Sequence, residues 1–215
     1  GETLEEPIII HGLAGSAMER QDMVKSLLEM VGLPRSTPTR YPHEFSGGQR
    51  QRISLARALA TKPKFIVADE AVSSLDVSIQ AQVLSLIRSL QKALGLSMLF
   101  ISHDLGAVRY ICDRIAVMYL GSIVEIAPSG ELFRHPKHPY TRTLMTAIPS
   151  LRASKRSDPA VVMGEMPSPL NPPSGCHFRN RCPVALPACA NQVPILDEVA
   201  PGHSSACIRH DLVDY

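Results

Sequence analysis

Two apolar, strand-sized segments each end in polar residues that could handle a phosphate group. Asp69 and Glu70 follow the apolar residues 65–68, and His103 follows residues 97–102. An acid at the end of a buried strand can hold Mg²⁺ through water, as enzymes that hydrolyse nucleotides require. A second acid beside it can polarise an attacking water molecule. A solvated acidic turn and a structural histidine explain the same residues, so each feature alone leaves both possibilities open.

A glycine-containing helix start lies upstream of the first strand. Ser46, Gly47, Gly48 and Gln49 have the Ser-x-x-Gln spacing of a capping box. Two glycines let backbone N–H groups approach a phosphate closely, and the helix N-terminus adds a positive dipole end. The segment therefore indicates an anion-binding site, with an ordinary capped helix as the alternative.

The elements that must position these residues follow from hydrophobic periodicity and capping signals. We expect an α/β fold, because strand, helix and strand with polar residues at the strand ends is typical of a sheet that binds ligands at its carboxyl edge. Asp76 is expected to cap the helix between the two strands, and Gly95 to end it. The predicted elements are helices at 19–31, 46–60, 76–94 and 105–111, strands at 65–68 and 97–102, and a hairpin at 115–126.

The composition of the chain changes near residue 150. Residues 151–160 are polar and charged, like a linker, and residues 161–215 are rich in proline and cysteine with little periodicity. Such a loop-rich module cannot build much of a core from apolar side chains alone. We therefore predict one domain over residues 1–150 and a linker with a small module over residues 151–215.

Composition also bears on partners. The formal net charge is +2, aromatics make up 5% and tryptophan is absent, so the sequence offers no basic stripe with interleaved aromatics and we expect no nucleic-acid partner. The longest apolar runs are strand-sized, far short of a membrane span. The N-terminal residues lack the basic and apolar regions of a signal peptide.

The order and spacing of these motifs resemble one family closely. The segment FSGGQRQRISLARALATKPKFIVADEAVSSLDVS, followed by LFISHDL, resembles the core of an ATP-binding-cassette (ABC) ATPase, and the resemblance runs from about residue 20 to residue 150. It identifies SGGQ as the signature, Asp69-Glu70 as Walker B, residues 74–76 as the D-loop and His103 as the switch histidine. Phe45 stands where the family usually has leucine, and Ala71 where it often has proline.

The resemblance implies a role for each motif. Asp69 would support Mg²⁺, Glu70 would be the general base for the attacking water, and His103 would contact the γ-phosphate of ATP. The signature residues Ser46, Gly48 and Gln49 would contact the γ-phosphate of a nucleotide held by a second ABC ATPase subunit, in a homodimer or a heterodimer.

The glycine-rich Walker A loop of that family, G-x-x-x-x-G-K-[ST], does not occur in these 215 residues. The resemblance therefore leads us to expect a form truncated just after the glutamine loop. We expect such a chain to be inactive alone, because its catalytic acids have no nucleotide to act on.

Four further segments narrow the resemblance to the oligopeptide, dipeptide and nickel importer ATPases. They are YLGSIVE (119–125), ELF (131–133), HPKHPYT (135–141) and PSPLNPPSGC (167–176). The resemblance implies peptide import, permease subunits in the membrane, a periplasmic or extracellular substrate-binding protein, and a peripheral position on the cytoplasmic face of the cell membrane. The alternatives are a nickel importer ATPase, a non-transport ABC ATPase of DNA repair or translation, and an inert remnant. The non-transport proteins typically carry coiled-coil insertions, basic tracts or a second cassette, which this sequence lacks.

Four cysteines gather near the C-terminus: Cys176, Cys182, Cys189 and Cys207. They lack the close pairs of structural zinc sites and the spacing of common ferredoxins. Their spacing is compatible with a four-iron cluster, an irregular zinc site or free thiols. The C-terminal extension of the resembling family is associated with a [4Fe–4S] cluster, which these positions match. Cys112 is interpreted as a small buried hydrophobe.

Overall fold

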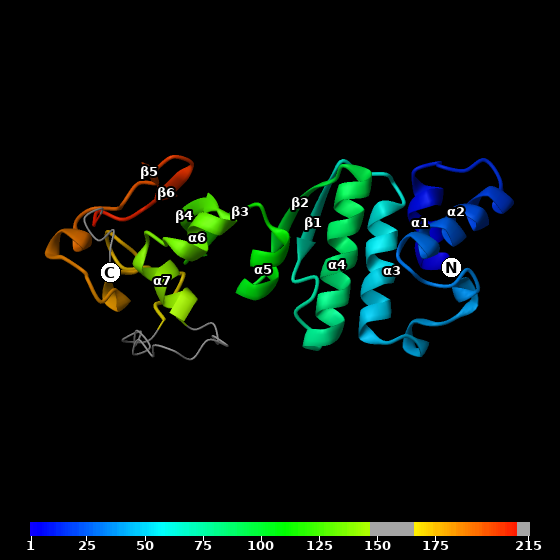
Figure 1. Cartoon of the computed structure of the whole chain (residues 1–215), viewed down its shortest axis with the longest axis horizontal. Helices are drawn as coiled ribbons and strands as arrows, with labels where there is room; N and C mark the ends of the chain where they lie inside the picture. Colours follow the sequence, from blue (N-terminus) through cyan, green and yellow to red (C-terminus); the bar gives the residue numbers. More distant parts are fainter. Residues whose placement is uncertain (147–165, 210–215) are drawn as a thin grey trace. The chain divides into compact units, whose positions relative to one another are not determined.

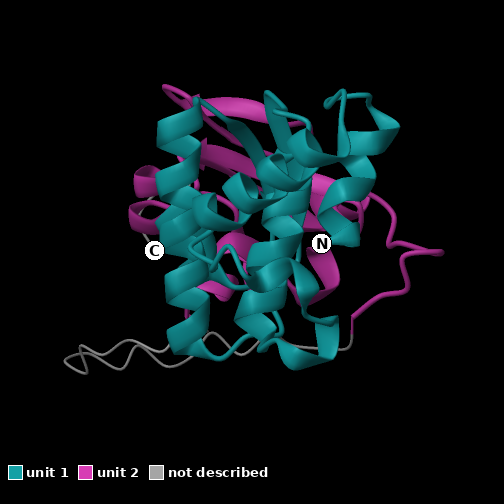
Figure 2. Cartoon of the chain, turned by 90° about the vertical axis from the view of Figure 1, so that its right-hand side faces the viewer, with its two compact units in different colours: residues 1–111 teal, residues 112–215 magenta. Residues whose placement is uncertain are grey.

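The structure is a computed structural model that describes residues 1–146 and 166–209. It forms two compact units, Gly1–Ile111 and Cys112–Tyr215 (Figures 1 and 2). The boundary between them differs from the sequence-based division at residue 150, because a strand of the cysteine-containing region pairs with the hairpin before that point. The division at residue 150 stays a prediction about functional regions, and the predicted linker at 151–160 lies outside the described residues.

Three helices build the main core of the first unit: α1 (Glu2–Ile10), α2 (Ala17–Met30) and α3 (Gly47–Leu59). Helix α1 was not predicted from the sequence, and it contains Pro7, which lacks an N–H donor. Burial of its apolar residues against α2 and α3 outweighs the lost hydrogen bond. The buried residues of this core include Leu4, Ile8, Val24, Leu28, Val31 and Ala56. Two 3₁₀ turns, η1 (Thr37–Thr39) and η2 (Pro42–Glu44), connect α2 to α3.

The remainder of the first unit confirms the strand, helix and strand order. Strand β1 (Phe65–Asp69) leads into α4 (Val77–Leu94), β2 (Ser97–Ile101) and the short helix α5 (Leu105–Ile111). Strands β1 and β2 are parallel, with Phe65 opposite Ser97, and α4 is the crossover between them. Helix α4 runs beside α3 (Figure 1) and ends where Gly95 adopts a φ of 64°. The parallel sheet with its helices is the α/β fold expected from the sequence.

One face of this two-stranded sheet carries exposed apolar side chains. Phe65, Val67, Leu99 and Ile101 are between 43% and 56% exposed, and the strand register places all four on the same face. Parallel sheets are usually covered on both faces. In the described residues, this sheet therefore lacks the cover that such strands normally have.

The second unit contains an antiparallel sheet in the order β3-β4-β6-β5. Strands β3 (Arg114–Tyr119) and β4 (Ser122–Pro128) form the predicted hairpin, and β5 (Asp197–Ala200) and β6 (His203–Ser205) extend it. The other elements are α6 (Ser129–Arg134), α7 (Pro139–Thr146) and the 3₁₀ turns η3 (Arg179–Arg181) and η4 (Pro187–Ala190). The cysteine-containing region thus contributes two strands that its weak periodicity did not predict.

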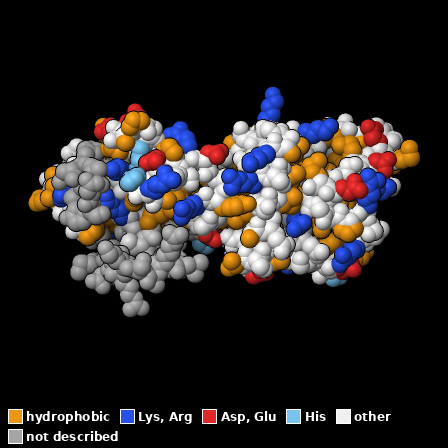
Figure 3. All heavy atoms as spheres, in the orientation of Figure 1, with side chains coloured by type: hydrophobic (Ala, Val, Ile, Leu, Met, Phe, Trp, Pro, Cys, Tyr) orange, Lys and Arg blue, Asp and Glu red, His pale blue; other side chains and the backbone are white. Residues whose placement is uncertain are grey.

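Within residues 1–146 and 166–209, no helix has the length and apolar character to cross a bilayer. On the face shown in Figure 3, lysine and arginine side chains are interspersed with acidic and apolar ones.

Candidate functional site

The parallel pairing of β1 and β2 brings their polar end residues together. The backbone N–H of Glu70 donates to the carbonyl of Ile101 at 3.0 Å, which extends the strand pairing by one bond. Beyond this point, Nδ1 of His103 lies 2.9 Å from Oε1 of Glu70. The predicted general base and the predicted γ-phosphate contact are therefore in direct contact, although 33 positions separate them in the sequence.

Each member of this pair favours the charged form of the other. The hydrogen bond from His103 lowers the pKa of Glu70, with a smaller contribution from Ser73. The same bond raises the pKa of His103. Glu70 also has a φ of 50°, a left-handed conformation that is uncommon for residues other than glycine. The lowered pKa favours the ionised form of the Glu70 carboxylate, which sits on an unusual backbone turn.

Asp69 lies exposed at the end of β1, directly before Glu70. The loop after β2 is held by Asp104, which follows His103 in the sequence. Its carboxylate accepts from Nε2 of Gln80 on α4 at 2.6 Å and from the backbone of Gly106 at 2.8 Å. The Gln80 bond is also the main reason that the pKa of Asp104 is lowered. Gln80 was not singled out, and its position one turn after Asp76 is the only signal that could have identified it.

The signature segment forms the capping box predicted for it. The hydroxyl of Ser46 accepts from the backbone of Gln49 at 3.3 Å, and the Gln49 side chain accepts from the backbone of Ser46 at 3.1 Å. Ser46 and Gly47 are exposed at the start of α3, whereas Gly48 is buried. The N-terminus of α3 is thus accessible while its second glycine packs inward.

The D-loop lies against the signature glycines. A Cβ added to Gly47 would lie 3.2 Å from Cδ2 of Leu75, and one added to Gly48 would overlap with Cγ2 of Ile79. Asp76 caps α4 as predicted, because its carboxylate accepts from the backbone of Ser78 and Ile79 at 3.1 and 3.0 Å. Signature and D-loop therefore form one packed corner between α3 and α4.

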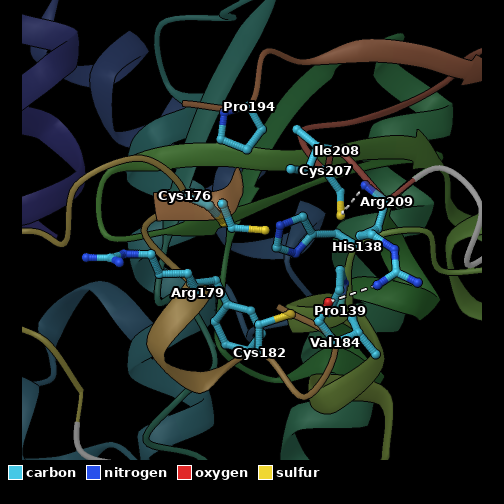
Figure 4. A pocket seen from close by; sticks show the side chains of 12 residues that line it. His138, Pro139, Cys176, Arg179, Cys182, Val184, Pro194, Cys207, Ile208 and Arg209 are labelled. Atoms are coloured by element: carbon cyan, nitrogen blue, oxygen red, sulfur yellow. Dashed lines mark hydrogen bonds between the residues drawn. The ribbon is translucent and has the colours of Figure 1, made fainter. Parts of the chain in front are cut away.

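The four C-terminal cysteines line one pocket of the second unit, together with His138 and Phe178 (Figure 4). All four are free thiols. Gly175 has a φ of 65°, and a Cβ there would overlap with the carbonyl of Cys189. This close approach lets the backbone N–H of Cys176 donate to the same carbonyl at 2.8 Å. A glycine is therefore required to bring two of the cysteine segments together.

Backbone N–H groups point at the sulfur atoms. Those of Leu186 and Arg209 donate to Sγ of Cys189 and Cys207, each at 3.4 Å. Burial raises the pKa of Cys176 and Cys207, and it raises that of Cys182 to about 11. The raised pKa values favour the protonated form of Cys176, Cys182 and Cys207.

Cys112 lies outside this pocket, and burial raises its pKa as well. Among the described residues, no three His, Cys, Asp or Glu side chains are arranged to hold a metal ion. The predicted metal ligands thus share a pocket without forming a ready-made single-ion site.

Comparison with known protein families matches the two parts of the chain separately. Residues 2–73 match the family model described as ABC transporter, which includes the signature and Walker B residues. Residues 124–189 match the model described as the oligopeptide/dipeptide transporter C-terminal region. Glu70 and the signature residues lie within the first match, and His103 lies between the two matches.

Curated relatives cover nearly the whole chain. A putative peptide import ATP-binding protein of Brucella ovis is 58% identical over 212 residues, which are 99% of this chain and 67% of the relative. The oligopeptide transport ATP-binding protein AppF of Bacillus subtilis is 52% identical over 95% of this chain and 62% of its own length. OppF of Escherichia coli is 50% identical over 98% of this chain and 64% of its own length. The chain belongs to the oligopeptide/dipeptide transport family of ABC ATP-binding proteins.

Proposed function

We propose that this chain is part of the ATPase subunit that energises peptide import by an ABC transporter. The observation that carries the proposal is the bond between Glu70 and His103 beside Asp69, at the carboxyl ends of two parallel strands. In open α/β sheets this edge is where nucleotides bind. The names of the relatives, which refer to peptide and oligopeptide import, supply the substrate class.

The three residues at this edge of the sheet are proposed to have different roles at the phosphate. Asp69 offers a carboxylate to Mg²⁺, and Glu70 is an ionised base for the attacking water. His103 contacts Glu70 through Nδ1 and is proposed to contact the γ-phosphate. Such positioned groups act mainly by stabilising charge and orienting the water.

The accessible start of α3 is proposed to face the ATP of a second ATPase subunit. Its Ser46 hydroxyl and glycine backbone lie at a positive helix end, which favours a phosphate. The remaining partners would be permease subunits and a substrate-binding protein, with the ATPase bound peripherally to the cytoplasmic face of the membrane.

The test uses the complete protein that contains this chain, assembled with its permease. Glu70→Gln should reduce ATP turnover by about 10²–10⁴-fold while ATP still binds, because the amide keeps the shape and loses the basic oxygen. Peptide uptake should fall with turnover. Glu6→Gln, which removes a carboxylate bonded to Arg57, is the matched control. Full ATP turnover by the Glu70→Gln protein would show that another residue is the general base. Uptake of nickel in place of peptide would show that the proposed substrate class is wrong.

We further propose that the four cysteines hold a [4Fe–4S] cluster. Its support is a pocket lined by Cys176, Cys182, Cys189 and Cys207 and the backbone N–H groups directed at sulfur. A single zinc ion needs its sulfur ligands about 2.3 Å away, whereas a cluster has a separate iron for each cysteine. Four cysteine side chains in one pocket match the number of protein ligands that such a cluster takes. When bound, it would supply four iron–thiolate bonds that join segments with a small apolar core.

The cluster is tested on protein purified without oxygen. We expect a brown protein with about four irons per chain, as Cys₄ ligation implies, and loss of iron when any one of the four cysteines is replaced by serine. Cys112→Ser should retain the iron. Stoichiometric zinc in iron-supplied protein would show that the four cysteines form a zinc site and not a cluster. Protein that contains no metal would overturn both interpretations.

A further inference from the structure

The segment HPKHPY at residues 135–140 marked the family resemblance, but the ATPase site gives it no role. A buried carboxylate holds this segment in place. Glu125 of β4 is completely buried, and its two oxygens accept from the backbone of Lys137 at 2.6 Å and of His138 at 3.0 Å. Nε2 of His203, on β6, lies 2.7 Å from the same carboxylate. The Glu125 carboxylate on β4 thus holds the backbone of His138 in place.

The ring of His138 is fixed as well. Its Nδ1 accepts a hydrogen bond from the backbone N–H of Tyr140 at 3.1 Å, so the proton of the neutral ring is on Nε2. His138 is only 1% exposed. Packing against Phe178, at 5.9 Å between ring centres, limits its rotation. The structure therefore holds a neutral imidazole with a defined N–H donor.

This imidazole lines the cysteine pocket. Figure 4 shows the His138 ring among the cysteine side chains, with the sulfur atoms of Cys176 and Cys207 directed toward it. The side chain of Arg179 points away from the pocket in the same view. Since Nδ1 is occupied by Tyr140, the nitrogen available to the pocket is Nε2.

We propose that His138 is a positioning residue of the cysteine site, whose Nε2–H donates a hydrogen bond to a cysteine-ligated iron–sulfur cluster. This inference rests on the cluster proposed above. An N–H donor to sulfur stabilises negative charge, and one-electron reduction makes the cluster more negative. Hydrogen bonds to the sulfurs are among the factors that set the potential of such clusters. His138 therefore raises the reduction potential.

The test compares reduction potentials of intact, anaerobically prepared protein by spectroelectrochemistry. His138→Phe removes the donor and keeps a ring, so the midpoint should move to a more negative value at unchanged iron content. His138→Gln restores an N–H donor and should recover part of the shift. His135→Gln is the matched control, because His135 lies in the same segment and is exposed. The midpoint potential of the His135→Gln protein should equal that of the wild type. A loaded His138→Phe protein with the wild-type potential would overturn the role of His138 and leave the cluster standing.

A second measurement needs no variant of His138. The protein carries His177→Gln, is labelled with [¹⁵N]histidine, and has its cluster reduced. Pulsed electron paramagnetic resonance should then show a weak coupling to ¹⁵N and a coupling to an exchangeable proton. Absence of both couplings in a loaded cluster would overturn the donor. A protein that takes up no iron would overturn the cluster itself, and with it the role of His138 toward it.

Discussion

At the scale of single residues, the contact between Glu70 and His103 has a defined pH dependence. The pKa of His103 is raised from 6.5, so its contribution to stability is complete below 6.5 and is lost as the pH rises through the raised value. The pKa of Glu70 is lowered from 4.5, so its contribution is complete above 4.5 and is lost as the pH falls through the lowered value. The ion pair is therefore fully formed between these limits and weakens on either side.

Replacing Glu70 should change the titration of His103. In Glu70→Gln the carboxylate that raises the pKa of His103 is gone, and we expect that pKa to fall toward 6.5. The measurement is an NMR titration of the His103 ring protons in the wild type and the variant. Glu6→Gln removes a carboxylate from the same unit without touching His103 and should leave the curve in place. An unchanged His103 curve in Glu70→Gln would show that the two side chains do not pair in solution.

At the scale of elements, the corner between α3 and α4 depends on a missing side chain. Gly48 lies so close to Ile79 that a methyl group on Gly48 would overlap with the Ile79 side chain. The resemblance implies that the same glycine contacts a phosphate. The glycine thus has a packing role in its own subunit in addition to any role at the nucleotide. Overpacking of this kind typically costs about 1–3 kcal/mol.

Gly48→Ala should therefore lower the free energy of unfolding by about 1–3 kcal/mol, as measured by chemical denaturation. Ile79→Ala in the same chain should relieve part of the loss, since it makes room for the methyl group. Gly130→Ala is the control, because a Cβ there meets only Nη1 of Arg134 at 3.9 Å. Equal stability of Gly48→Ala and the wild type would show that α3 and α4 can move apart at no cost.

At the scale of the whole molecule, the described residues bring Glu70 and His103 together at the carboxyl ends of β1 and β2. The Walker A pattern is absent from the sequence, and the sheet that carries Glu70 exposes Phe65, Val67, Leu99 and Ile101 on one face. The chain also spans only 62% to 67% of three curated relatives.

A polypeptide of these 215 residues should accordingly show no saturable binding of Mg-ATP. The backbone cradle and lysine that hold the β- and γ-phosphates in P-loop enzymes have no counterpart in it. Isothermal titration calorimetry should give only heats of dilution, while the complete protein, titrated under the same conditions, should bind. Micromolar affinity of the 215-residue polypeptide would mean that the signature and Walker B residues suffice.

The sequence by itself determined features that depend on neighbouring residues. Asp76 caps α4 and Ser46 with Gln49 forms a capping box, because each bond spans two or three positions and local patterns record it. The order β1-α4-β2 and the hairpin at β3 and β4 follow from periodicity over short windows. Even so, the isolated motifs did not reveal α1, whose Pro7 argues locally against a helix, or strands β5 and β6, whose residues show little alternation.

Only the tertiary structure decided which distant residues meet. Glu70 reaches His103 across 33 positions because β1 and β2 pair in parallel, and His203 reaches Glu125 across 78 positions because β6 pairs with β4. His138 enters the cysteine pocket for the same reason, since the carboxylate that fixes its backbone is held by that second sheet. Strand pairing and burial produce these contacts between residues that are far apart in the sequence. No local sequence pattern can therefore predict the contacts.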